Sequence, residues 1–221
     1  STIAANTDLG SGMQVAMKDL EIRGAGNLLG GEQSGHIADV GFDLYVRMVG
    51  EALANFKGEE KSRDSEVRIE LPLDAYLPHE YVPSERLRLD MYKRLAEADS
   101  YEQIEQVRAE LSDRFGTLPF QAETLLKVAQ LRIDVIAAGL LEVINTGPSI
   151  RFAPVDLKDS VQLRISRLYP KAVIKPATRT VLIPRGLNAD KSELSDDELL
   201  DWVRAVLAAL AHSVPLATDR S

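Results

Sequence analysis

The chain has 221 residues and no cysteine, which excludes disulfides and thiolate metal sites, and its three histidines lie far apart in sequence. A formal net charge of −8 argues against strong nucleic-acid binding by these residues alone, because duplex affinity rests on neutralising phosphates with lysine and arginine. No apolar run reaches the roughly 18 residues of a membrane span, so we expect a soluble, cytoplasmic protein without a membrane segment.

Two helical patterns flank a glycine-rich loop near the start of the chain. Apolar residues recur at i, i+3, i+4 and i+7 from Met13 to Leu20, and a similar stripe runs from Phe42 to Phe56. Eight of the 14 glycines lie between Gly10 and Gly41, so the loop backbone can adopt positive φ and approach another surface closely. The pattern predicts a helical hairpin with a functional connecting loop.

Phosphate binding by this loop is not supported by its residues. A P-loop needs lysine and a hydroxyl after its last glycine, whereas Gly31 is followed by Glu32 and Gln33. A dinucleotide fingerprint needs a third glycine where Leu29 stands, and no apolar strand leads into the turn. We therefore expect no nucleotide or other cofactor to bind these residues.

The segment from Lys57 to Glu66 has the composition of a solvated linker. It is charged, contains one glycine and has no large apolar residue, and all ten prolines of the chain lie after it. We therefore predict a domain boundary near residue 63, which divides the chain into residues 1–63 and 64–221.

The second domain is predicted to be α+β, with about four helices and a small sheet. A serine cap opens three of the helices, and capping boxes are expected at Ser100 with Gln103 and at Ser195 with Glu198. Short β-branched runs separated by proline and glycine predict strands. The expected helices span 84–98, 100–115, 119–139 and 195–210, and the expected strands span 67–71, 141–144, 149–152, 172–175 and 180–183.

No catalytic arrangement of residues is recognisable in the second domain, so we interpret it as an interaction domain. If Ile104, Val107, Leu111 and Phe115 face inward, one exposed helix face is acidic. Such a face either keeps the domain soluble or docks on arginines of a partner. This acidic face of the helix expected at residues 100–115 consists of Glu102, Gln106, Glu110 and Asp113.

A second charged segment has the opposite sign. Residues 164–185 hold six basic residues and no acidic one, within predicted strands. This run is compatible with a contact to DNA or to a motor domain, and equally with lysines that guard a sheet edge. The sequence assigns it no role.

Several motifs resemble known families. Asp19-Leu-Glu-Ile-Arg-Gly-Ala-Gly, followed by Leu28-Leu-Gly and Gln33-Ser-Gly, resembles the translocation motif shared by the RecG and bacterial transcription-repair coupling factor (Mfd) families. Leu89-Asp-Met-Tyr-Lys-Arg-Leu-Ala and Glu110-Leu-Ser-Asp-Arg-Phe-Gly-Thr-Leu-Pro resemble the C-terminal domain of the coupling factors, whereas RecG ends soon after its motif. The resemblance covers nearly all of residues 8–140 and is weak beyond them.

This resemblance implies a fragment of an ATP-dependent translocase on double-stranded DNA that displaces stalled RNA polymerase and recruits excision repair through UvrA. Residues 1–63 would end the second RecA-like lobe, and Arg23, Gln33, Gly24 and Gly26 would couple lobe movement to DNA. ATP and Mg would bind the parent motor, and the fragment alone would be catalytically inactive.

For residues 64–221 the resemblance implies an autoinhibitory domain. It would dock on the N-terminal UvrB-like region of the parent and hide the UvrA-binding surface, with Glu110 and Asp113 expected at the contact. Two alternatives remain open, a RecG-like branch-migration helicase and a protein-interaction module without a motor. Helicase motifs upstream in the parent gene would distinguish a motor from a module.

Overall fold

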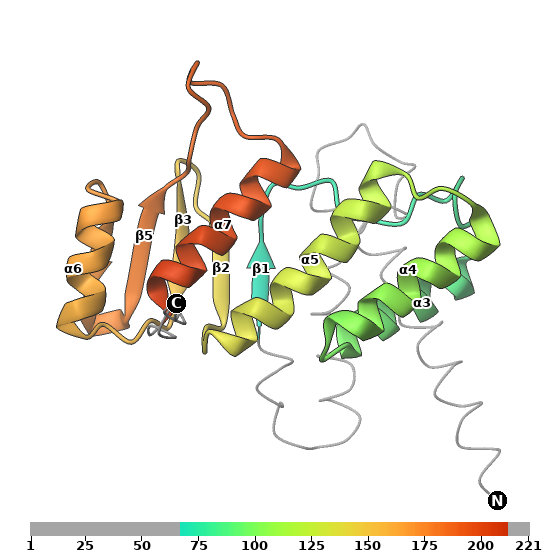
Figure 1. Cartoon of the computed structure of the whole chain (residues 1–221), viewed down its shortest axis with the longest axis horizontal. Coiled ribbons are helices and arrows are strands. Elements are labelled where there is room, and N and C mark those ends of the chain that lie inside the picture. The colour runs from blue at the N-terminus through green and yellow to red at the C-terminus, as the bar shows by residue number, and fades with distance from the viewer. Residues whose placement is uncertain (1–66, 212–221) are drawn as a thin grey trace, which may run out of the picture. The chain divides into compact units, whose positions relative to one another are not determined.

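The computed structural model describes residues 67–211, so the helical hairpin, the linker and the predicted boundary near residue 63 lie outside the described residues. The described part is α+β, as predicted, with five α-helices and a five-stranded sheet (Figure 1). In chain order its elements are β1 (Arg68–Glu70), α3 (Glu85–Glu97), α4 (Tyr101–Phe115), α5 (Phe120–Ala137), β2 (Glu142–Asn145), β3 (Ser149–Ala153), α6 (Asp159–Leu168), β4 (Val173–Lys175), the 3₁₀ turn η3 (Pro176–Thr178), β5 (Thr180–Pro184) and α7 (Asp196–Leu210).

The sheet has the strand order β1-β2-β3-β5-β4. β1 and β2 are parallel, and the other neighbours are antiparallel. A parallel pair needs a long crossover connection, which here contains α3, α4 and α5. The buried residues Val143, Phe152 and Val181 align across β2, β3 and β5, and Ile174 of β4 continues this row at the edge. One face of the sheet therefore supplies its half of the hydrophobic core.

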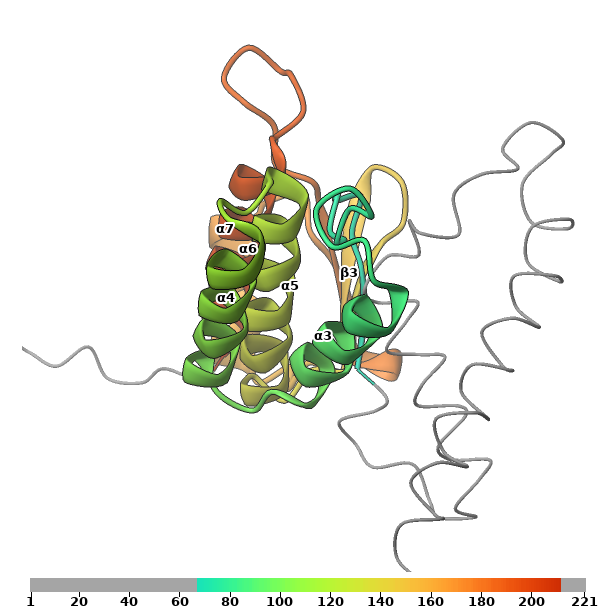
Figure 2. The same cartoon turned by 90° about the vertical axis from the view of Figure 1, so that its right-hand side faces the viewer.

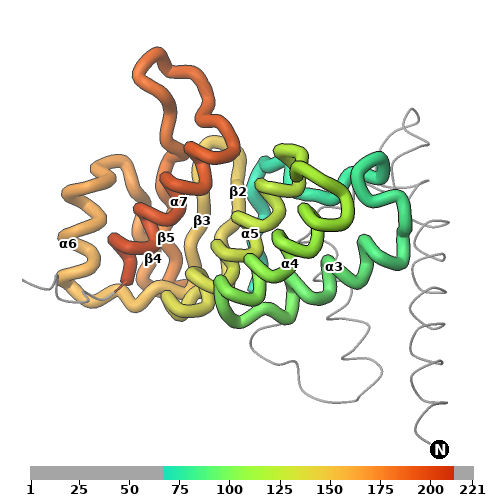
Figure 3. The backbone as a smooth tube through the Cα atoms, turned by 45° about the vertical axis from the view of Figure 1, so that its right-hand side comes forward, coloured from blue at the N-terminus to red at the C-terminus, as the bar shows by residue number. Residues whose placement is uncertain are grey.

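The helices supply the other half of the core. α5 packs against both α4 and α7, while α3 contacts α4 and α6 contacts α7. Figure 2 shows α4, α5 and α7 together on one side of β3. Leu125, Leu126 and Leu131 of α5 are completely buried, which matches the central place of this helix. The order of helix contacts places α3 and α4 at one end of the domain and α6 at the other (Figure 3).

The helix ends follow the predicted capping chemistry with one exception. Ser195 and Glu198 form the complete capping box that begins α7. At α4, Ser100 accepts from the backbone N–H of Gln103, but the Gln103 side chain accepts from the N–H of Asp99 instead of Ser100. The predicted capping box at Ser100 is therefore only half formed.

α6 is the element that the sequence analysis did not predict. Val161 and Ile165 are buried one helical turn apart, and this spacing turns a short ten-residue helix toward the core. The basic run therefore begins on a helix, and the expectation that it lies within strands is wrong for residues 164–168. The domain has five α-helices among residues 67–211 instead of about four.

Candidate functional site

The acidic face of α4 is formed as the sequence pattern predicts. Ile104, Val107 and Leu111 are buried and set the rotation of the helix about its axis. Glu102, Gln106 and Asp113 are consequently exposed, whereas Glu110 is only half exposed. Three of the four predicted contact residues are therefore accessible to a partner along one side of α4.

Glu110 has a different role from the other members of the face. One carboxylate oxygen accepts from Arg94 of α3 at 2.5 Å, and the other accepts from Arg114 at 2.8 Å. The hydrogen bond from Arg94, reinforced by Arg114, holds the pKa of Glu110 below its ordinary value against the effect of partial burial. Glu110 thus fastens α3 to α4, and its carboxylate is already engaged within the domain.

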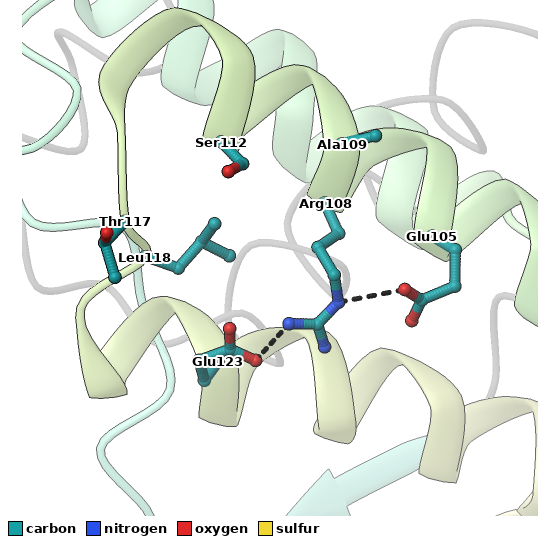
Figure 4. Close-up of a pocket in the computed structure, with 7 residues that line it drawn as sticks. All are labelled: Glu105, Arg108, Ala109, Ser112, Thr117, Leu118 and Glu123. Atoms are coloured by element: carbon teal, nitrogen blue, oxygen red, sulfur yellow. Dashed lines mark hydrogen bonds and ion pairs between the residues drawn. The ribbon is translucent and has the colours of Figure 1, made fainter.

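A hollow of about 390 Å³ lies beside the same helix, between α4 and α5 (Figure 4). Arg108 projects into it and pairs with Glu123 of α5 and, at 3.0 Å, with Glu105. Partial burial opposes the charge of Arg108, but the two carboxylates outweigh it and raise the pKa of the guanidinium. Because Arg108 is paired on both sides, the hollow does not offer it to an incoming anion.

The first turn of α4 is fixed to the helices behind it. The hydroxyl of Tyr101 donates to Asp134 of α5 at 2.6 Å, and the other oxygen of Asp134 lies 3.3 Å from Nε of Arg204 on α7. Burial, together with the hydrogen bond to Asp134, raises the pKa of Tyr101 to about 12, so the phenol stays protonated in this contact. The acidic face therefore lies on a helix that is tied directly to α3 and α5 and, through Asp134, to α7.

These contacts leave a simple distribution of charge on α4. Arg94, Arg108 and Arg114 all pair with carboxylates, while Glu102 and Asp113 pair with no cation of residues 67–211. The sequence analysis missed the pairing of the arginines. Two of these ion pairs could have been predicted from the sequence, since Glu105 with Arg108 and Glu110 with Arg114 have the i, i+3 and i, i+4 spacing of helical ion pairs.

The predicted coupling residues Arg23, Gln33, Gly24 and Gly26 lie outside the described residues. Within residues 67–211, no three His, Asp or Glu side chains gather in a way that could hold a metal ion. No helix of the same range is long and apolar enough to cross a membrane.

Comparison with known proteins identifies relatives of the whole chain. A family model described as the TRCF domain matches residues 71–162. The transcription-repair-coupling factor of Mycobacterium bovis is 45% identical over 227 aligned residues, which cover 96% of this chain and 18% of that protein. The factor of Staphylococcus epidermidis is 45% identical over 152 residues, which cover 68% of this chain and 13% of that protein. The chain thus spans less than a fifth of these relatives.

A solved structure has the same fold. The crystal structure of the C-terminal domain of a transcription-repair coupling factor aligns with a TM-score of 0.52 and 22% identity, and covers 65% of this chain and 91% of that domain. The sequence matches and the shared fold agree with the resemblance of the motifs, so the chain belongs to the transcription-repair coupling factor family.

Proposed function

We propose that this chain is the C-terminal part of an ATP-dependent double-stranded DNA translocase that displaces stalled RNA polymerase and recruits excision repair through UvrA. Support comes from family membership, because the 45% identity extends over 96% of the chain and thus well beyond residues 67–211. The parent's RecA-like lobes would bind ATP and Mg and grip the DNA. The chain itself would transmit and regulate the movement of the motor.

For the described domain we propose autoinhibitory docking through the acidic α4 face. The observation that carries this proposal is the pair of exposed carboxylates, Glu102 and Asp113, which have no cation partner among the described residues, whereas the arginines of α3 and α4 that form ion pairs do so with other carboxylates. Unpaired carboxylates on a fixed helix suit docking on arginines of another surface, since rigid positioning lowers the entropy lost on binding. The UvrB-like region of the parent would supply the arginines, and docking would cover its UvrA-binding surface.

The test is charge reversal in the full-length parent. In the Glu102→Lys/Asp113→Lys double variant, docking should fail and UvrA binding should strengthen by about tenfold, as expected for two lost charge contacts. Asp156→Lys/Asp201→Lys is the matched control, because it makes the same change of charge away from α4. Equal UvrA affinity in the variant and the unmodified parent would show the assignment to be wrong. Glu110 is avoided because its reversal would disturb the contact between α3 and α4.

We also propose that Arg23 and Gln33, in the loop that contains Gly24 and Gly26, couple the motor to DNA. The guanidinium of arginine is always charged and can bind two acceptors at once, whereas the ammonium of lysine cannot replace it in such a contact. Arg23→Ala in the parent should lose translocation much more than ATP hydrolysis, and Arg23→Lys should restore little. Equal loss of both activities, measured on the same preparation, would contradict the coupling role.

A further inference from the structure

The hollow between α4 and α5 borders the acidic face of α4. Ala109 and Ser112 of α4 line the hollow, together with residues of the loop that follows and of α5. Ala109 lies three residues after Gln106 and four residues before Asp113, so it shares a side of the helix with both. A partner that covers the acidic face therefore also meets the mouth of the hollow.

Glu123 offers an unoccupied carboxylate oxygen to this hollow. Its Oε2 accepts from Arg108, whereas its Oε1 accepts no hydrogen bond from any of residues 67–211. Figure 4 shows this second oxygen pointing into the hollow, on the side where Leu118 lies. The side chain of Glu123 is only 36% exposed, so this oxygen is partly withdrawn from water. A donor that reaches it would form a stronger hydrogen bond than it would with a carboxylate in bulk water.

The rest of the lining suits a long cationic side chain. Ser112 and Thr117 contribute hydroxyls, and neither hydroxyl forms a hydrogen bond within the described part of the chain. A hydroxyl oxygen can accept from a cation. Leu118 forms an apolar wall on the side opposite Arg108 (Figure 4). The charged lining residues are two glutamates and one arginine, which leave the hollow with one formal negative charge.

The domain already contains a carboxylate that is shared by two arginines. Glu110 accepts from Arg94 at 2.5 Å with one oxygen and from Arg114 at 2.8 Å with the other. Glu123 holds one arginine in the same way and has its second oxygen free. The volume of about 390 Å³ lies near the lower end of the roughly 300–1,000 Å³ of ligand pockets, which is room for one side chain.

We infer that the hollow is a socket for one arginine side chain of the surface on which α4 docks. The guanidinium would donate to Oε1 of Glu123 and to the hydroxyls of Ser112 and Thr117. The aliphatic stem would pack on Leu118. Arginine fits better than lysine, because an ammonium is more strongly hydrated and loses more on leaving water. This inference rests on the docking proposed for the acidic α4 face and names its anchor, since an enclosed arginine contributes more to affinity than charge pairs at an exposed rim.

The experiment titrates the isotope-labelled 221-residue chain with acetyl-arginine methylamide and follows its backbone amide signals by NMR. Saturable shifts are expected at Thr117, Leu118 and Glu123 at millimolar ligand concentrations. Acetyl-citrulline methylamide has nearly the same shape without the charge, and it should bind about tenfold more weakly, because its hydrogen bonds to the carboxylate are no longer between two charged groups.

Two variants of the chain test the site itself. Ser112→Phe fills the hollow without changing its charge and should abolish the shifts. Glu123→Gln keeps the size of the side chain but removes the carboxylate, so it should weaken binding of the arginine amide by about tenfold and leave the citrulline amide unaffected. The matched control, Ala205→Phe, places the same ring at an exposed position of α7 and should bind as the unmodified chain does. Circular dichroism verifies that each variant is folded.

Three results of the titration would overturn the inference. The first is the absence of shifts around the hollow. The second is a set of shifts that persists in Ser112→Phe, because the ligand would then bind elsewhere. The third is equal binding of the arginine and citrulline amides, which would show that the carboxylate of Glu123 does not select a cation.

A second measurement separates the socket from the docking on which it rests. In the full-length parent, Ser112→Phe should strengthen UvrA binding as Glu102→Lys/Asp113→Lys does. If the double reversal strengthens UvrA binding and Ser112→Phe does not, α4 docks without the socket and the inference is wrong. If neither variant changes UvrA binding while the chain still binds the arginine amide in the hollow, the docking proposal fails and the socket itself stands.

Discussion

The α3–α4 end and the α6–β4 end of the domain differ in the sign of the charges that remain unpaired. At the α3–α4 end, carboxylates pair with Arg94, Arg108 and Arg114, and the charges left unpaired on α4 itself are the carboxylates of Glu102 and Asp113. At the α6–β4 end, α6 begins with the carboxylate of Asp159, but residues 160–189 contain no acidic residue, and the charges left unpaired among them are cations. The net charge of −8 conceals this division. Partner recognition depends on the charges that remain unpaired in the folded domain, which a sum over the sequence does not show.

Both ends of the domain pack on the same hydrophobic core. Leu111 of α4 and Ile165 of α6 are both completely buried and belong to one continuous hydrophobic core. The ends therefore differ at their surfaces but not in how they are held. Because the core is shared, we predict that both ends unfold in one transition. Substitutions in this core, which have the largest expected effect on stability, test that prediction.

Leu111→Ala and Ile165→Ala should each lower the free energy of unfolding by about 2 to 5 kcal/mol, because each removes buried methyl groups and leaves a cavity. Urea unfolding can be followed by circular dichroism and by the fluorescence of Trp202, the single tryptophan. The ring of Trp202 contacts Tyr169, just after α6, at a centroid distance of 6.3 Å, so its fluorescence reports on the α6–β4 end. Both signals should give the same transition in both variants.

Leu163→Ala is the control for these variants, since Leu163 is exposed and its truncation should change stability by less than about 0.5 kcal/mol. Separate fluorescence and circular dichroism transitions in Ile165→Ala would mean that the α6 end unfolds on its own. The comparison between the ends would then extend from their surfaces to their stabilities.

A smaller effect is expected for Glu110, whose ion pairs are partly exposed. Glu110→Gln should cost about 1 kcal/mol at neutral pH, because it removes the charge shared by Arg94 and Arg114. The pKa of Glu110 is lowered in the folded state, so its contribution is fully present above about pH 4.5, its ordinary value, and is lost as pH falls through the lowered pKa. Urea unfolding of both proteins across the acid range measures this difference, which should shrink toward zero.

Arg167, at the α6–β4 end, provides the control for the dependence of stability on pH. Arg167 has no carboxylate partner among the described residues, so Arg167→Gln should leave the dependence of stability on pH unchanged. A constant difference between Glu110→Gln and the unmodified protein over the whole acid range would contradict the ion-pair role of Glu110. It would attribute the loss to packing between α3 and α4 instead.

Sequence patterns predicted elements best where they were long and capped. α4 and α7 begin at the expected serines, and α4 ends at the expected residue 115, followed by Gly116 with a φ of 81°. All five strands of the sheet were placed within one residue at each end, because short β-branched runs bounded by proline, glycine or charged residues have few other conformations. The rotation of α4, and with it the exposure of Glu102 and Asp113, followed directly from the spacing of its apolar residues.

Features that depend on distant residues were not predictable. α6 buries only Val161 and Ile165, too few apolar positions to distinguish a short helix from the neighbouring strands. The engagement of Glu110 depends on Arg94, sixteen residues away on another helix, so no local pattern could show that this carboxylate is occupied. The same limit applies to the parallel pairing of β1 with β2, which are separated by three helices.

That parallel pairing has a mechanical consequence. β1 is the edge strand that follows directly from residues 1–66, and it is held by its ladder with β2, by the N–H of Arg68 bonded to Leu141, and by Arg132, which donates to the carbonyl of Val67. A pulling force applied along β1 from the preceding chain would act parallel to the strand. It would therefore strain these hydrogen bonds in shear and all together, instead of breaking them one after another from one end. A strand attached in this way is suited to anchor the domain against a pulling force.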